Sequence, residues 1–109
     1  MTKAKMDWRR MELTLEGHAG SDVPGKDLVC CAESILTQAL VNALADLQMK
    51  AGCTRAEWSG SKEDGSMRIR ATVNWSNLSL VRGYFEVTVT GLRMLADRYP
   101  EYITLQEEN

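Results

Sequence analysis

The fold is decided within residues 11–49, MELTLEGHAGSDVPGKDLVCCAESILTQALVNALADLQM. From Met11 to Glu16 apolar and polar residues alternate, which is the period of a half-buried β-strand. From Asp27 to about Met49 apolar residues instead recur every three or four positions, which places them on one face of an α-helix. The residues of this apolar stripe are Val29, Ala32, Leu36, Leu40, Leu44 and Leu47. A strand followed by an amphipathic helix is therefore the centre of the predicted fold.

The ends of this helix carry their own signals. Asp27 is expected to be the N-cap, because a short carboxylate can accept a hydrogen bond from the free backbone N–H groups that follow it. That assignment places Cys30 in the first helical turn, close to free N–H groups and to the positive end of the helix dipole. Gly52 is expected to end the helix.

Outward from this centre, the chain continues as further strands and one more helix. The strands are expected near residues 3–8, from Ala56, across 67–75 after a turn at 62–65, and at 102–105. Residues 77–98 contain strand-like β-branched residues, but apolar residues hold helical spacing over the longer window, which favours a helix capped by Asn77. We predict one α+β domain, residues 1–109, with a mostly antiparallel sheet of four to five strands and two helices packed on it.

Composition excludes several classes of protein. The net charge of −2 argues against a nucleic-acid binder, whose footprint would be basic. No signal peptide is recognisable, and no apolar run is expected to reach the roughly twenty residues that span a bilayer, so no membrane partner is predicted. Three cysteines, two of them adjacent, do not suit a disulfide framework and favour reduced thiols in a cytoplasm.

One histidine and a cysteine pair are the candidate chemical groups. His18 is the only histidine, and Cys30-Cys31 follow it by twelve residues. A thiol becomes a strong nucleophile when an imidazole can deprotonate it, so any such chemistry must use His18. The alternative is that these cysteines are small buried apolar residues, which we favour for Cys31 and Cys53. Adjacent helical side chains point about 100° apart, and periodicity alone does not decide which thiol faces His18.

The surroundings of the cysteine pair leave further alternatives. Ser34 lies one turn after Cys30 and could donate to a thiolate or orient His18, or it could bond a backbone carbonyl one turn back. The negative charges of Asp27 and Glu33 would oppose thiolate formation. Backbone N–H groups around the cysteine pair are candidates for an oxyanion hole. A metal site is not predicted because the C-x-x-C spacing is absent, and no cofactor is expected.

Residues 17–34 carry a resemblance to a known family. Gly17-His18-Ala19, a short loop, and then Gly25-Lys26-Asp27-Leu28-Val29-Cys30-Cys31-Ala32-Glu33-Ser34 resemble the signature of the Prp family of ribosomal-processing cysteine proteases. The family pattern is G-H-A, a loop, and G-x-D-[IV]-V-C-A-A-x-S with the same separation of histidine and cysteine. A weaker likeness continues through Tyr99-Pro100-Glu101-Tyr102-Ile103.

The resemblance implies specific roles. It assigns the nucleophile to Cys30, its acid/base partner to His18, and supporting positions to Gly17, Asp27 and Ser34. It implies a bacterial, cytoplasmic homodimer whose substrate is the precursor of a large-subunit ribosomal protein. The enzyme would remove the N-terminal extension of that precursor after a pair of aromatic residues, as a step in ribosome biogenesis. Some phage structural proteins carry a like site.

This chain departs from the family pattern in three places. Cys31 replaces an alanine, Glu33 replaces a usually apolar residue, and aromatic residues are missing from the loop that would contact the peptide. That substrate loop comprises Gly20, Ser21, Asp22, Val23, Pro24 and Gly25. A non-catalytic module that binds the ribosome or a phage component through the same fold is therefore the alternative hypothesis.

Overall fold

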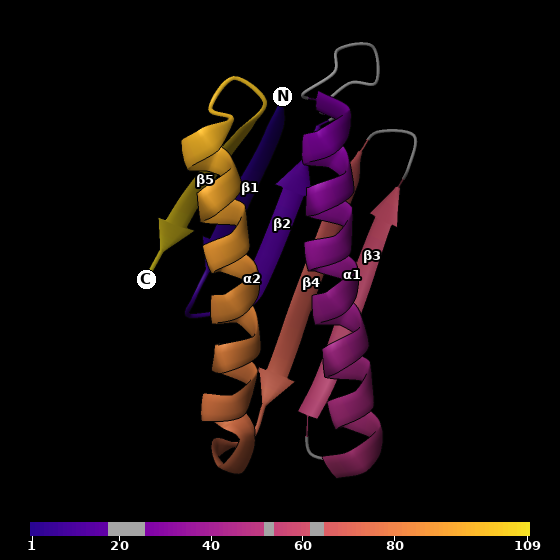
Figure 1. Ribbon diagram of the computed structural model, residues 1–109. Coiled ribbons are helices and arrows are strands. Elements are labelled where there is room, and N and C mark those ends of the chain that lie inside the picture. Colours follow the sequence, from indigo (N-terminus) through magenta and orange to yellow (C-terminus); the bar gives the residue numbers. More distant parts are fainter. Residues whose placement is uncertain (18–25, 52–53, 62–64) are drawn as a thin grey trace.

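Two helices lie side by side on one face of a five-stranded sheet in the computed structural model (Figure 1), which describes residues 1–17, 26–51, 54–61 and 65–109. In chain order the elements are β1 (Thr2–Asp7), β2 (Glu12–Glu16), α1 (Lys26–Ala51), β3 (Thr54–Ser61), β4 (Ser66–Val73), the 3₁₀ helix η1 (Trp75–Asn77), α2 (Leu78–Arg98) and β5 (Ile103–Glu108). The predicted α+β architecture with two helices is confirmed.

The sheet has the strand order β3-β4-β2-β1-β5. β1 pairs antiparallel with β2, β2 with β4, and β3 with β4, while β1 and β5 run parallel. The parallel pair arises because α2 lies between β4 and β5 in the chain and returns it to the far edge, where β5 runs in the direction of β1. A mixed sheet that is mostly antiparallel matches the prediction.

Buried and exposed side chains alternate along the strands, so one face of the sheet is apolar and covered by the helices and the other face is polar. Leu13, Leu15 and Ile69 point towards the helices and are buried, and α2 adds the fully buried Phe85. On the opposite face charged side chains pair across strands, as between Arg68 and Glu12 at 2.8 Å. The hydrophobic layer under the two helices is what holds them on the sheet.

The two helices approach each other closely at Gly91. A Cβ added there would lie 2.6 Å from Leu36 Cδ2, so the absent side chain makes room for a leucine of α1. Leu36 belongs to the apolar stripe predicted for that helix and is half-buried. The contact orients α1 so that one flank faces α2 and the opposite flank faces β3.

Helix boundaries confirm some predictions and correct others. The choice of helix over strand for this segment is confirmed, and Asn77 stands at the N-cap position of α2, but its side chain makes no capping hydrogen bond. α1 begins at Lys26, which places Asp27 inside the first turn rather than at the N-cap. The expected strand 67–75 ends at Val73, and Trp75 begins η1 instead. Gly52 lies outside the described residues.

The expectation about apolar runs is wrong. Residues Leu28–Lys50 of α1 are long and apolar enough to cross a membrane by length and composition alone. Within Leu28–Lys50 the polar residues are mostly uncharged, so the segment stays apolar on average although polar residues interrupt it. In the structure 33% of the most apolar window is buried inside the protein, and the core helix of a soluble protein passes the same test.

Candidate functional site

Gly17 follows the last residue of β2 and directly precedes His18. Its φ is +93°, a conformation that residues with a Cβ rarely adopt. A Cβ at this position would also overlap the carbonyl oxygen of Met1. The peptide that carries this oxygen is held in place, because Thr2 N–H donates to Tyr102 O at 2.9 Å. Glycine is therefore required here by both its backbone angle and its surroundings.

Several predicted site residues fall outside the described part of the chain. These are His18, the whole substrate loop from Gly20 to Gly25, and Cys53. The backbone of Asp27 belongs to α1, whereas its side chain is outside the description. The roles assigned to these residues remain predictions.

Cys30 lies two residues deeper in α1 than the sequence indicated, in the second turn and not the first. Because the helix starts at Lys26, the N–H groups without helical acceptors are those of residues 26–29, and the N–H of Cys30 is within reach of the Lys26 carbonyl. The oxyanion hole expected from backbone N–H groups around the cysteine pair stays a prediction, although a Cys30 N–H that bonds the Lys26 carbonyl would not contribute to it. Stabilisation of a thiolate by the helix dipole is also weaker than in the first turn, so activation depends more on a side-chain partner.

A shallow groove of about 400 Å³ runs along α1 from the cysteine pair. Its lining is uncharged and mostly apolar, and it consists of Cys30, Cys31, Ser34, Ile35 and Gln38. Cys30 is half-buried and packs against the core, whereas Cys31 is exposed. The two thiols thus differ in environment as their 100° separation requires. The preference for Cys31 as a buried apolar residue is wrong.

Ser34, one turn along, keeps its hydroxyl free of hydrogen bonds to the described residues, although its backbone carbonyl accepts from Thr37 Oγ1 at 3.2 Å. The alternative that Ser34 bonds the carbonyl one turn back is therefore not seen. Its hydroxyl is left to face the groove.

Ile35 and Gln38 were not predicted from the sequence as residues of this site. Gln38 follows Cys30 by eight residues and so lies in the same row as Ser34. Ile35 is an apolar side chain outside the apolar stripe, and it is 67% exposed. The sequence did contain one signal for this site. Ile35 is an apolar residue that lies outside the apolar stripe of the helix and close to the candidate nucleophile.

Glu33 points away from the groove towards β1. Its Oε2 accepts a hydrogen bond from Thr2 Oγ1 at 3.2 Å, and its Oε1 is buried without a hydrogen-bond partner among the described residues. Burial raises the pKa of the Glu33 carboxyl, and this outweighs the lowering by the Thr2 hydrogen bond and by the Met1 ammonium. The negative charge expected to oppose thiolate formation is thus directed to the sheet side of α1.

We predict that Glu33→Gln stabilises the protein at neutral pH. A raised pKa means that the folded state binds the proton more tightly than the unfolded state, so wild-type stability falls as pH rises from about 4 through the folded-state pKa. Gln keeps the acceptor for Thr2 without the charge, and the expected gain is about 1 kcal/mol in the free energy of unfolding. Urea unfolding of both proteins across this pH range measures it.

The gain should vanish in acid, where Glu33 is itself protonated. The exposed Glu101 provides the matched control, and Glu101→Gln should leave stability nearly unchanged at every pH. A gain for Glu33→Gln that is independent of pH would contradict the assignment.

The described segments contain no candidate metal site, because no three histidine, cysteine or acidic side chains lie close enough together there to hold a metal ion. The chemistry available in these segments is that of a half-buried thiol at the head of an uncharged groove. A neighbouring hydroxyl from Ser34 accompanies it.

Solved structures share this fold over almost the whole chain. A protein from Streptococcus mutans, SMU.848, is 31% identical, with a TM-score of 0.68 over 97% of this chain and 90% of its own. The essential ribosomal processing protease Prp from Staphylococcus aureus, solved with a substrate peptide, is 20% identical with a TM-score of 0.79 over 99% of this chain and all of its own. The same protease with a covalently linked product peptide gives a TM-score of 0.76 at 19% identity.

Comparison with curated proteins gives no significant match. The model of the family described as cysteine protease Prp matches residues 1–104. This range includes the strand, the Gly-His-Ala triplet and the helix with the cysteine pair, and it agrees with the resemblance found in the sequence. The chain belongs to the cysteine protease Prp family.

Proposed function

We propose that this chain is a cysteine endopeptidase that uses Cys30 as its nucleophile and His18 as its general acid/base. The observation that carries the proposal is the position of Cys30, half-buried at the head of an uncharged groove, in the register of the family motif. Family membership supports proteolysis as the reaction class. Asp27 and Gly17 are proposed as supporting residues on the motif.

In the proposed mechanism the Cys30 thiolate attacks the carbonyl carbon of the scissile peptide. The proton held by His18 passes to the leaving amine as the C–N bond breaks, which leaves a thioester on Cys30. Water then attacks the thioester, with His18 accepting its proton, and the thiol and a carboxylate are released. The Ser34 hydroxyl, one turn from Cys30, makes no hydrogen bond to the described residues and is proposed to donate to the thiolate or to orient His18.

The proposed substrate is the precursor of a large-subunit ribosomal protein, cleaved after its N-terminal extension. The resemblance of residues 17–34 supports it, and so does a solved structure of similar fold that is described as a ribosomal processing protease. Phage structural proteins with a like site are proposed as a second substrate class. A bacterial cytoplasm and a homodimeric state complete the proposal.

Thiol reactivity tests the proposal without knowledge of the cleavage sequence. We expect iodoacetamide to label Cys30 at a pH where an ordinary thiol of pKa about 8.5 is mostly protonated. Mass spectrometry of the digested protein after a pH series measures the labelling of each cysteine. Cys31 is an internal control because it is adjacent in the chain and more exposed.

His18→Ala should remove the early labelling of Cys30 and leave that of Cys31 unchanged. If the two cysteines titrate alike in the wild-type protein, the dyad is excluded. The non-catalytic binding module then becomes the better hypothesis.

A further inference from the structure

The outer edge of β3 presents backbone hydrogen-bonding groups. β3 is an end strand of the sheet, and the Ala56 N–H donates to Gln48 Oε1 of α1 at 2.8 Å, so this N–H points away from β4. Because N–H groups alternate in direction along a strand, those of Trp58 and Gly60 point to the same outer side. An edge of this kind can accept an extended peptide as a further strand.

The groove beside Cys30 lies on the same flank of α1. Gln48 follows Cys30 by eighteen residues, which is five helical turns, so the two residues share one helix face. Gln48 reaches β3, and the row of Cys30, Ser34 and Gln38 therefore faces the side of α1 on which β3 lies. β3 passes behind α1 at its start and emerges beside it towards its end (Figure 1).

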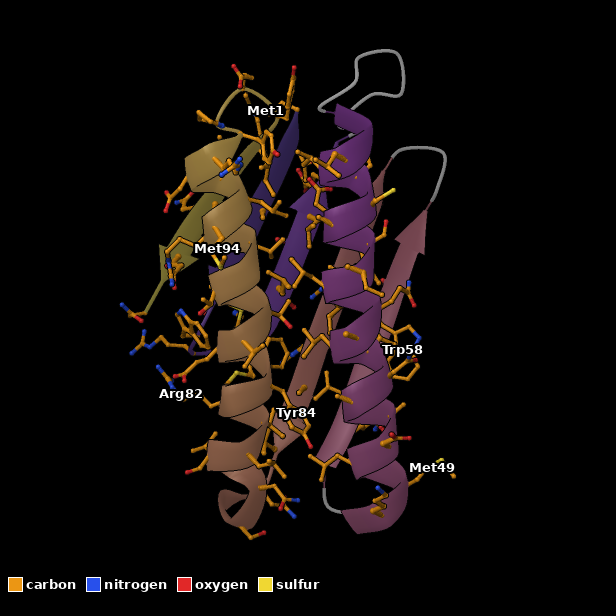
Figure 2. The ribbon with its side chains drawn as sticks, in the orientation of Figure 1. Met1, Met49, Trp58, Arg82, Tyr84 and Met94 are labelled. Atoms are coloured by element: carbon orange, nitrogen blue, oxygen red, sulfur yellow. The ribbon has the colours of Figure 1, made fainter. Side chains whose placement is uncertain are left out.

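Trp58 adds an exposed aromatic ring to this flank. It pairs with Ile69, which is fully buried, so its side chain is on the helix-bearing face of the sheet. The residue is nevertheless 46% exposed, and its side chain lies over β3 beside α1 (Figure 2). A large amphipathic ring that is left half in solvent is typical of the residues that anchor binding partners.

Helix and strand geometry gives the spacing between these features. Cys30 and Gln48 are about 27 Å apart along the helix. β3 runs towards the Cys30 end of α1 (Figure 1), and Trp58 is two residues beyond Ala56, which brings it about 7 Å closer. Trp58 and Cys30 are therefore separated by ~20 Å along the helix direction, which an extended chain covers with about six residues.

We propose that an extended, uncharged segment of the substrate adds to the outer edge of β3, with its scissile bond at Cys30 and a side chain about six residues away packed on Trp58. The uncharged lining by Ser34, Ile35 and Gln38 fits this chemistry in a chain of which 26% of the residues are charged. The inference rests on the proposed function. It adds a specificity-determining residue remote from the cleaved bond.

Peptide length tests the inference. Fluorescently labelled peptides copied from the processing site of the host ribosomal protein are made with about three or about eight residues, first on the N-terminal and then on the C-terminal side of the cleaved bond. Anisotropy with the Cys30→Ala protein measures the Kd without turnover. We expect the longer peptide of one of the two series to bind about tenfold more tightly.

Trp58→Ala should remove this gain for the long peptide and change the Kd of the short peptide less than about twofold, whereas Trp58→Phe should retain most of it. Met94→Ala is the matched control, since Met94 is a large apolar side chain that is 67% exposed on α2. It should alter neither Kd. A Trp58→Ala effect of equal size on both peptides would contradict the spacing.

Strand addition itself is tested by N-methylation of the long peptide. Methyl groups at alternate backbone nitrogens should weaken binding about tenfold in one register and little in the other, because only one set of N–H groups faces β3. Equal effects in both registers, or no gain with length in either series, would overturn the inference. If the inference is overturned in this way but the wild-type protein still cleaves short peptides, the proposed function is supported. If the wild-type protein cleaves none of the peptides, that result counts against the proposed function and not against strand addition.

Discussion

Cys30→Ala is expected to abolish peptide cleavage. Removal of a nucleophile lowers kcat by about 10⁴-fold or more, since no other group can form the thioester. The substitution removes only a sulfur atom from a half-buried position, so the fold should persist. The measurement is kcat/KM on a peptide that spans the processing site of the host ribosomal protein, with circular dichroism to confirm folding.

Cys31→Ala is the matched control for this experiment. Cys31 also lines the groove, but it is exposed and points about 100° away from Cys30, and the family pattern has alanine at its position. Its removal should change kcat/KM less than about threefold. If instead Cys31→Ala is the inactive variant, the register of the motif assigns the wrong thiol.

Gly17→Ala is expected to damage both stability and activity. An alanine at φ +93° is strained, and its Cβ would overlap the Met1 carbonyl in a peptide that the Thr2–Tyr102 hydrogen bond holds in place. The strain alone corresponds to about 2 kcal/mol, which is a fall of about 10 °C in Tm for a domain of this size. Gly17 directly precedes His18, so a backbone shift should also lower kcat by about 10²-fold.

Gly83 provides the opposite control within the same protein. It lies within α2, and a Cβ added there meets no atom within 4 Å. Gly83→Ala should therefore stabilise the protein by about 0.5–1 kcal/mol, because alanine loses less backbone entropy in a helix. Thermal unfolding of the two variants should shift Tm in opposite directions. A Gly17→Ala protein as stable as the wild type would show that this turn tolerates a side chain.

The sequence indicated the candidate nucleophile and its motif, but not the surroundings of that nucleophile. Cys30 was predicted in the first turn of the helix, and the structure places it in the second, because the helix begins before Asp27. Ile35 and Gln38 were missed, since a helical pattern shows which face is apolar and not what lies beside the opposite face. The hydrogen bond between Thr2 and Glu33 joins residues 31 positions apart, and no local pattern predicts such a pair.

The sequence by itself determined the order and type of the elements. Alternation over Met11–Glu16 and helical spacing over Asp27–Met49 depend on local side-chain direction, which repeats every two residues in a strand and about every 3.6 in a helix. The motif from Gly17 to Ser34 likewise needs no tertiary contact to be recognised. Only the tertiary structure decided that α1 faces β3 through Gln48 and α2 through Leu36. It also decided which thiol is exposed and that β3 is an end strand of the sheet, because these features arise when distant segments pack against one another.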